Sequence, residues 1–236
     1  MKIIAVGDIH GRNTWKRVLE KEPGYDRFVF VGDYLDNFPP MTAEKILANF
    51  EEILELKRSN PGKVVLLIGN HDFHYMSQGE GEMYSGYNPK IKAKARKLFT
   101  DNADLFNVAY QCNDILFTHA GVTSTWAEDN KINHLKSVDV ARQIDSLFEK
   151  NPDAFRFYPG DTSSSGDHIK QGPFWVRPRT LSGDMFPGLR QVVGHTGVAQ
   201  IVTVEGGLTL IDTGRRGDYL KVVRGGKMII GEPYLV

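Results

Sequence analysis

Cysteine is nearly absent from this sequence: Cys112 is the only one among 236 residues. A single cysteine excludes both an intrachain disulfide and a cysteine-rich zinc site. A chain without disulfides is typical of a reducing compartment, and we therefore expect a cytoplasmic protein.

The sequence also lacks an excess of charge of either sign. Lys and Arg together number 29, as do Asp and Glu, so the formal net charge is +0. This balance gives no strong nucleic-acid signal and no reason to expect binding to an anionic membrane surface. Long hydrophobic runs are absent as well. The apolar run after Lys2 is too short for a signal-peptide core, and no other run is long enough to cross a bilayer.

The composition that remains is that of an ordinary folded protein. Hydrophobic residues make up 41% of the chain and charged residues 25%, values that are typical of a globular domain and not of a disordered chain. A length of 236 residues fits one sizeable domain better than two, so we expect a single domain over residues 1–236.

Short apolar runs alternate with helix-like segments in the first third of the chain. The runs at 3–6, 28–31 and 64–68 are typical of strands that are buried on both faces. Helices are expected over about 14–22 and from an N-cap at Thr42 to about Arg58. This alternation predicts a parallel sheet in an α/β fold.

The rest of the chain is less regular. We expect a loop over 78–89 and a basic helix with a solvated face over 90–102. We expect irregular loops that cover one face of the domain over about 120–190, interrupted by a helix over 138–150. The aromatic residues of 155–175 are expected to form the core of those loops. Strands are expected at 106–110, 115–118, 191–193, 199–204, 208–211, 219–223 and 228–230, with hairpin turns at 206–207 and 225–226.

Five short motifs that combine glycine with Asp, Asn or His each fall just past an apolar run. The loops beyond the carboxyl ends of parallel strands form the ligand crevice of α/β sheets, so motifs far apart in sequence can meet there. Carboxylate, imidazole and amide oxygen suit a pair of divalent cations, and the glycines permit sharp turns. One such motif alone is typical of a simple turn, but the whole set in order indicates a metal site. The motifs are Gly7-Asp8-Ile9-His10-Gly11, Gly32-Asp33-Tyr34-Leu35-Asp36, Gly69-Asn70-His71-Asp72, Thr118-His119-Ala120-Gly121 and Gly194-His195-Thr196.

This set resembles the calcineurin-like metallophosphoesterases, whose pattern is GDxHG, GDxxD, GNH[ED], a later His and a GH near the end. It is most similar to the phosphoprotein phosphatase branch, which includes bacteriophage lambda phosphatase and the symmetrical diadenosine tetraphosphate hydrolases. Two features favour that branch: the GHxH of many phosphodiesterase relatives is replaced by Gly194-His195-Thr196-Gly197, and His119 lies in a Thr-His-Ala-Gly context. The resemblance spans residues 7–196 and implies an α/β fold, a four-layer α/β/β/α sandwich with two mixed sheets.

The resemblance also implies two divalent metal ions, manganese or else iron with zinc. Such a pair clamps a phosphate and lowers the pKa of a bridging water, so that hydroxide attacks phosphorus in line without a covalent enzyme intermediate. The ligands it implies are Asp8 and His10 for the first ion, Asp33 between the two ions, and Asn70, His119 and His195 for the second.

A proton donor for the leaving group is implied in the same way. His71 matches the family's general acid, and Asp36 matches the carboxylate that orients its imidazole. We expect Asp72 to cap a loop or support the ligands, and His74 to be structural.

The sequence departs from the family pattern directly after Asp36. Protein phosphatases continue with Arg-Gly there, and that arginine binds phosphate oxygens, whereas this chain has Asn37. Asparagine has no permanently charged fork, so another arginine is expected to take over. Arg177 is the first candidate and Arg12 the second, and the other candidates are Arg179, Arg215 and Arg216.

Three hypotheses about function follow. The first is a two-metal phosphomonoesterase that acts on a phosphoprotein or a small phosphorylated compound. The second keeps the site but makes the substrate a dinucleoside tetraphosphate, cleaved symmetrically, or a nucleic-acid end; the missing arginine and the string Gly69-Asn70-His71-Asp72-Phe73-His74 favour it slightly. The third is a non-catalytic scaffold of the same fold, which is disfavoured because every ligand of the pattern is present.

Overall fold

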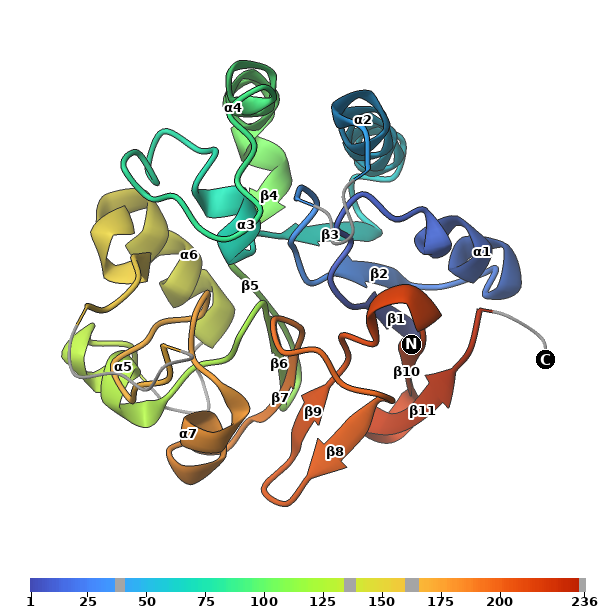
Figure 1. Cartoon of the computed structure of the whole chain (residues 1–236). Helices are drawn as coiled ribbons and strands as arrows, with labels where there is room; N and C mark the ends of the chain where they lie inside the picture. Colours follow the sequence, from blue (N-terminus) through green and yellow to red (C-terminus); the bar gives the residue numbers. More distant parts are fainter. Residues whose placement is uncertain (37–40, 134–138, 160–165, 234–236) are drawn as a thin grey trace.

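The computed structural model describes residues 1–36, 41–133, 139–159 and 166–233. Two sheets form its centre (Figure 1). The first has the order β11-β10-β1-β2-β3-β4. Strands β1 to β4 are parallel neighbours, and β10 and β11 extend the sheet in antiparallel fashion beyond β1. The bounds are β1 Ile3–Val6, β2 Arg27–Phe30, β3 Val64–Leu67, β4 Phe106–Asn107, β10 Tyr219–Val223 and β11 Lys227–Gly231.

The second sheet has the order β5-β6-β7-β9-β8 and is also mixed. Strands β6, β7 and β9 run parallel, while β5 and β8 are antiparallel edges. The bounds are β5 Ala109–Cys112, β6 Ile115–Thr118, β7 Arg190–Val193, β8 Val202–Val204 and β9 Leu208–Leu210. The expected hairpin turns at Gly206–Gly207 and Gly225–Gly226 are confirmed, and all four glycines have a positive φ that a side chain would strain.

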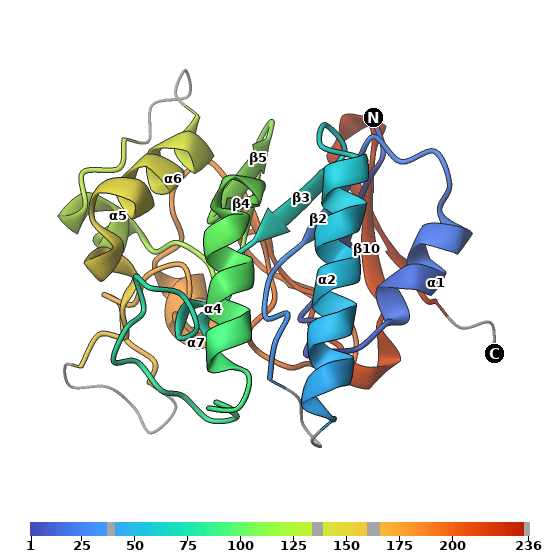
Figure 2. The ribbon, with the colours of Figure 1, turned by 90° about the horizontal axis from the view of Figure 1, so that it is seen from above.

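Three helices cover the outer face of the first sheet: α1 Thr14–Lys21, α2 Ala43–Ser59 and α4 Lys92–Asp101. Figure 2 shows them side by side over the strands. The expected N-cap of α2 is confirmed, since the Thr42 hydroxyl accepts a hydrogen bond from Lys45 N at 3.4 Å. The basic face of α4 is solvated and paired with acidic residues, as Lys94 with Glu51.

The other helices lie on the far side of the molecule from α1 (Figures 1 and 2). They are α5 Ser124–Asp129, α6 Val140–Lys150 and α7 Pro178–Gly183, and the four-residue helix α3 Asn70–Phe73 follows β3. Single-turn 3₁₀ helices complete the fold: η1 Ala103–Leu105, η2 Pro152–Phe155, η3 Gly214–Arg216 and η4 Arg224–Gly226.

Successive side chains of β1 point to opposite faces of the sheet and show how the layers pack. Ile3 and Ala5 face a core that also contains Phe117 and Val192 of the second sheet, so the two sheets pack face to face. Ile4 packs in the core under the helices. A third core, which includes Val193 and Leu181, joins the second sheet to α7. This arrangement of helices outside two packed mixed sheets confirms the expected four-layer fold.

Several expectations differ from the structure. The strand expected at 106–110 is two strands in different sheets, divided at Val108, because β4 pairs with β3 while β5 pairs with β6. The strand expected at 199–204 is shorter and consists of β8 alone. The short helices α3, α5 and α7 were not predicted from the sequence. The helix expected from residue 138 begins at Val140, because Asp139 is its N-cap and accepts a hydrogen bond from Arg142 N; residue 138 lies outside the described residues. The aromatics expected to be core material are so: Phe155 and Phe174 are fully buried and contact each other.

Within the described residues, none of the helices combines the length and the apolar composition that crossing a membrane requires.

Candidate metal centre

The five motifs meet at one place because each follows a central strand. Asp8 comes two residues after β1, Asp33 three residues after β2, and Asn70 opens α3 just after β3. His119 directly follows β6 and His195 lies two residues after β7. The first sheet thus supplies four of the candidate ligands and the second sheet two, at the edge where the two sheets meet.

The backbone at this edge is unusually constrained. His10, Asp33, Asp36 and His195 have φ values of 44°, 54°, 53° and 60°, in the left-handed region that side chains seldom adopt. Each such residue costs of order 1 kcal/mol, and residues of this kind cluster at functional sites. Glycines allow the close approach around them: a Cβ on Gly69 would collide with the Asp33 carboxylate, and one on Gly194 with the Asp8 carboxylate.

The first group of ligand atoms consists of two carboxylates and one imidazole. His10 Nε2 lies 3.9 Å from Asp8 Oδ2 and 3.6 Å from Asp33 Oδ2. His195 N donates a hydrogen bond to Asp8 Oδ1 at 3.0 Å, and His71 N donates one to Asp33 Oδ1 at 2.9 Å. Both carboxylates are therefore fixed by main-chain donors.

The second group shares Asp33 with the first. His119 Nε2 lies 3.5 Å from Asp33 Oδ2, 2.8 Å from Asn70 Oδ1 and 3.2 Å from His195 Nδ1. His195 Nδ1 in turn lies 3.0 Å from Asn70 Oδ1. Asp33 Oδ2 faces the Nε2 atoms of both His10 and His119, which is the position that a bridging ligand would take.

The histidine tautomers show that these groups fit cations. His119 Nδ1 lies 2.9 Å from Val31 O, and His10 Nδ1 lies 2.7 Å from Asp36 O. A carbonyl only accepts hydrogen bonds, so each Nδ1 carries the proton and each Nε2 directs a lone pair at carboxylate or amide oxygens. Lone pairs that face lone pairs at these distances are the arrangement a bound cation resolves, and donation from Nδ1 to a carbonyl is the usual support of a histidine metal ligand.

Burial of the candidate ligands also shifts their pKa values. Burial and then the charge of Asp212 raise the pKa of Asp8 well above its ordinary value, and burial and then Asp8 raise that of Asp33. Burial, followed by the charge of His71, lowers the pKa of His10 to about 4.

Burial is also the largest cause that lowers the pKa of His119, to about 3. At neutral pH both imidazoles are thus neutral, the form in which histidine binds metal ions. The buried carboxylates beside them call for positive charge, which divalent ions would supply.

Asp72 links the loops that carry the ligands. Its Oδ2 accepts hydrogen bonds from Asp33 N at 2.7 Å and Gly69 N at 2.9 Å, and its Oδ1 accepts one from Tyr34 N at 2.8 Å. The expectation that Asp72 caps a loop is confirmed, and the cap joins the turn after β2 to the start of α3.

His71 and Asp36 are brought together beside the ligand groups. His71 Nδ1 lies 3.0 Å from Asp36 Oδ2, and the His71 ring meets the His10 ring edge-on at 5.2 Å. Burial acts to raise the pKa of Asp36, but hydrogen bonds from His71, His74 and Tyr75 outweigh it and the pKa is lowered. Asp36 is therefore an anion that can orient the imidazole and stabilise its charged form.

The candidate arginines differ in their placement. Arg177 Nη1 donates to His195 O at 3.0 Å and to Thr196 Oγ1 at 3.2 Å, and its buried Nε has no hydrogen-bond partner among the described residues. Arg12 Nη2 donates to Asp8 O at 2.8 Å, so it supports a ligand loop. Arg216 pairs with Asp218, and Arg179 is exposed. Asn37 lies outside the described residues.

Asp212 belongs to the site but was not among the expected residues. It follows β9, its charge raises the pKa of Asp8, and its Oδ1 accepts a hydrogen bond from Gly214 N at 2.9 Å. The signal was present in the sequence, because Asp212 follows an apolar run as Asp8 and Asp33 do, but it lacks the glycine that precedes them.

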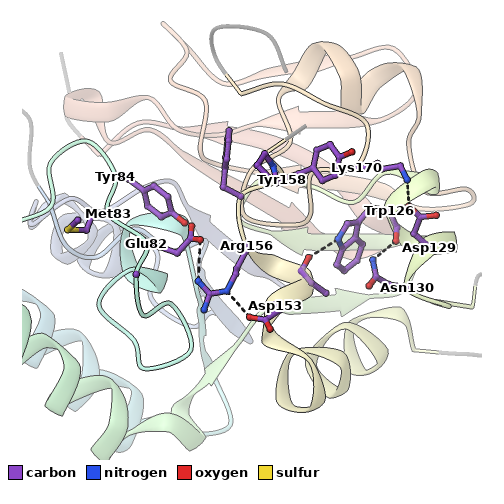
Figure 3. A pocket seen from close by; sticks show the side chains of 14 residues that line it. Glu82, Met83, Tyr84, Trp126, Asp129, Asn130, Asp153, Arg156, Tyr158 and Lys170 are labelled. Atoms are coloured by element: carbon purple, nitrogen blue, oxygen red, sulfur yellow. Dashed lines mark hydrogen bonds and ion pairs between the residues drawn. The ribbon is translucent and has the colours of Figure 1, made fainter. Parts of the chain in front are cut away.

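A cavity of about 790 Å³ lies near the site, between α5, η2 and the segment 81–84 (Figure 3). Its charged side chains are paired with each other: Arg156 with Glu82 and Asp153, and Lys170 with Asp129. Tyr84, which lines the cavity, contacts the Trp175 ring at 4.2 Å between centroids, and Trp175 in turn contacts the candidate ligand His195 at 6.0 Å.

Comparison with known proteins agrees with this geometry. The model of the calcineurin-like phosphoesterase family matches residues 1–198. A symmetrical bis(5'-nucleosyl)-tetraphosphatase of Baumannia cicadellinicola subsp. Homalodisca coagulata is 28% identical over 160 residues, which are 62% of this chain and 51% of that protein. The match thus spans about half the length of this curated relative.

Solved structures show the same fold. A cold-active protein-tyrosine phosphatase of a psychrophilic Shewanella species has a TM-score of 0.65 at 21% identity, with 98% of this chain and 78% of that chain covered. A protein serine/threonine phosphatase of Saccharomyces cerevisiae has a TM-score of 0.62 at 17% identity, with 100% and 80% covered. At these identities the likeness supports the fold.

Proposed function

The chain belongs to the calcineurin-like phosphoesterase family, and from this premise we propose that it hydrolyses phosphomonoesters, of a phosphoprotein or a small phosphorylated compound, with two divalent metal ions. The observation that carries the proposal is the pair of Nε2 lone pairs, on His10 and His119, that face the shared Asp33 carboxylate at 3.6 and 3.5 Å. Two adjoining donor groups with one common carboxylate are the architecture of a two-metal hydrolase.

The two ions would share Asp33, and each would have further protein ligands of its own. Two ions bound here would clamp the phosphate and generate hydroxide at neutral pH by lowering the pKa of water. The oxygen and imidazole donors, without thiolate, suit manganese, which we propose, as well as iron and zinc. The proposed ligands are Asp8, His10 and Asp33 for the first ion, and Asp33, Asn70, His119 and His195 for the second.

His71 is the proposed general acid. Asp36 accepts a hydrogen bond from Nδ1–H of His71, so Nε2 is the nitrogen whose proton can move to the oxygen of the leaving group. The carboxylate stabilises the imidazolium until that transfer and fixes the orientation of the ring.

Arg177 is the proposed phosphate ligand in place of the arginine that is missing at Asn37. Its guanidinium is anchored through Nη1 to the loop that carries His195, which leaves donors of the fork to hold phosphate oxygens. Arg12 is the second proposal, in a supporting place, because its Nη2 holds the Asp8 carbonyl.

The proposal is tested with metal-stripped protein reloaded with manganese. We expect hydrolysis of p-nitrophenyl phosphate, little hydrolysis of its bis-ester, and loss of activity in Asp33→Asn. Exposed Asp104→Asn, which removes a carboxylate far from the ligands, is the matched control. Metal binding without turnover of any phosphoester would contradict the proposal and favour a non-catalytic scaffold.

A second substrate class is favoured by one observation, the match to the symmetrical bis(5'-nucleosyl)-tetraphosphatase. On this alternative the chain cleaves a dinucleoside tetraphosphate, or a phosphate at a nucleic-acid end. A kcat/KM for diadenosine tetraphosphate well above that for p-nitrophenyl phosphate would put this alternative first.

A further inference from the structure

Asp36 is surrounded by more donors than the pair with His71 requires. Its Oδ2 lies 3.0 Å from His71 Nδ1 and also 2.8 Å from His74 Nε2, and its Oδ1 accepts a hydrogen bond from Tyr75 Oη at 2.5 Å. The Asp36 and His74 side chains are completely buried. One carboxylate thus lies within 3.0 Å of two imidazoles and accepts a hydrogen bond from a phenol.

The tautomer of His74 follows from its other ring nitrogen. Tyr84 N donates a hydrogen bond to His74 Nδ1 at 3.3 Å, so Nδ1 is the acceptor and Nε2 carries the proton that faces Asp36. Burial is the largest influence on His74 and its pKa is lowered, which keeps the ring neutral with that single proton.

The same tautomer argues against a further metal ion at this cluster. Asp36, His71 and His74 have ligand atoms close enough to hold one. Both histidines, however, present an N–H to the carboxylate, and a metal would need a lone pair in that place. The cluster is a polar network in which Asp36 is hydrogen-bonded to His71 and Tyr75 and lies in close contact with His74 Nε2.

Residues 84–88 contact the His74 and Tyr75 side chains of this network. Besides the Tyr84 N–H, the Asn88 N–H donates to Tyr75 Oη at 2.8 Å. The Tyr84 ring stacks on His74 with centroids 5.3 Å apart, and the Tyr87 ring stacks on Tyr75 at 5.2 Å. Tyr84 also lines the cavity of Figure 3, where its side chain is labelled.

We propose that His74, together with Tyr75, is a positioning residue that fixes the Asp36 carboxylate and through it the proton-donating orientation of His71. This proposal adds to the structural role expected for His74. Its Nε2–H helps to position the general acid His71 through Asp36, in addition to packing in the protein interior. This inference rests on the proposed function, since it presupposes that His71 protonates the leaving group.

The proposal is tested by comparing two substrates whose leaving groups differ in basicity. p-Nitrophenolate leaves readily, whereas the more basic phenolate depends on a proton donor. In manganese-loaded His74→Phe, which keeps a ring against Tyr84, kcat for phenyl phosphate should fall by about tenfold. We expect kcat for p-nitrophenyl phosphate to change by less than about twofold and both KM values to stay constant. His74→Gln, which restores an N–H near Asp36, should recover most of the loss.

His168 offers a matched control. It accepts a main-chain hydrogen bond on Nδ1, from Lys170 N at 3.1 Å, and stacks on Tyr158, but it lies outside the Asp36 cluster. His168→Phe should leave both substrates unaffected. Equal losses on both substrates in His74→Phe, or no loss while His71→Asn loses phenyl phosphate activity selectively, would overturn the inference.

Proton NMR separates this inference from the proposed function. The His74 Nε2–H bound to a carboxylate should give a downfield resonance that disappears in His74→Phe and shifts in Asp36→Asn. A wild-type protein that hydrolyses neither substrate contradicts the proposed function. Absence of the resonance contradicts the arrangement proposed for His74, whatever the activity.

Discussion

At the scale of single residues, the candidate ligands are held by close contacts with glycine backbone. Gly194 lies against the Asp8 carboxylate and Val31, and a Cβ there would overlap Asp8 Oδ1. Because ligand carboxylates need a fixed orientation, Gly194→Ala should weaken manganese binding by about 10- to 100-fold. Calorimetric titration of the metal-stripped protein measures this.

The control for that titration is Gly62→Ala. A Cβ on Gly62 meets nothing within 4 Å, so manganese affinity should stay at the wild-type value. An unchanged affinity in Gly194→Ala would show that Asp8 does not bind metal in the position described.

Arg177 permits a second test at this scale. Lysine keeps the charge but has no planar fork that can bind the His195 loop and phosphate together. Arg177→Lys should therefore lower kcat/KM for p-nitrophenyl phosphate by about tenfold, mainly through KM. The exposed Arg179→Lys on α7 should behave as the wild type. Equal kinetics of the two variants would exclude Arg177 as the phosphate ligand.

At the scale of elements, Glu22 joins the end of α1 to two strands of the first sheet. Its Oε1 accepts hydrogen bonds from Tyr219 Oη at 2.7 Å and Lys221 Nζ at 2.6 Å, and its Oε2 accepts one from Lys2 Nζ at 3.3 Å. Burial acts to raise the pKa of Glu22, but these donors outweigh it, so the pKa is lowered from the ordinary value of 4.5.

A carboxylate with a lowered native pKa stabilises the fold above its unfolded pKa, and this contribution is lost as the pH falls through the native pKa. Glu22→Gln should therefore cost about 2 kcal/mol of unfolding free energy near neutral pH and progressively less in acid. Urea unfolding across the acid range measures the difference. Exposed Glu20→Gln is the control, and a cost from Glu22→Gln that does not vary with pH would refute the assignment.

Strands β1, β2 and β3 of the first sheet could be predicted from sequence because each is a short apolar run. The division of 106–112 into β4 and β5 could not, because the apolar character continues through Val108. The division depends on Asp145 of α6, which accepts hydrogen bonds from Val108 N at 2.7 Å and Ala109 N at 3.2 Å. A contact made 37 residues away along the chain leaves no local signal.

The candidate site also has features that the sequence could predict and features that it could not. The types and order of the motifs were sufficient to propose Asp8, Asp33 and the other ligands, which the structure brings together. The contact of His74 with Asp36 was not predictable, because it depends on a left-handed turn at Asp36 and on which nitrogen of His74 is protonated. Such properties arise from tertiary packing.

At the scale of the whole molecule, the proposed ligands come from both sheets: His119 and His195 follow strands of the second, and the others follow strands of the first. Bound ions would link the two sheets and offset the repulsion between the buried Asp8 and Asp33, whose pKa values are raised. Ions present at 100 times their dissociation constant stabilise a fold by about 2.7 kcal/mol. Removing them with a chelator should therefore lower the melting temperature by roughly 5–10 °C.

Differential scanning calorimetry with and without manganese measures this shift. His119→Ala, which removes a ligand from the second sheet, should melt at nearly the same temperature in both conditions. A wild-type melting temperature that does not respond to manganese would contradict a metal centre shared between the sheets.

The place of β1 in its sheet has a consequence for biosynthesis. The first candidate ligands directly follow β1, yet one of the two neighbours of β1 is β10, and the pairing of Ile3 with Val222 forms only after β10 has been made. Until β10 has been made, Asp8 would follow a strand with one unpaired edge, and His195 would be absent for most of that time. We therefore expect metal insertion to follow the synthesis of β10, and ribosome-bound chains that end before β10 to retain manganese poorly.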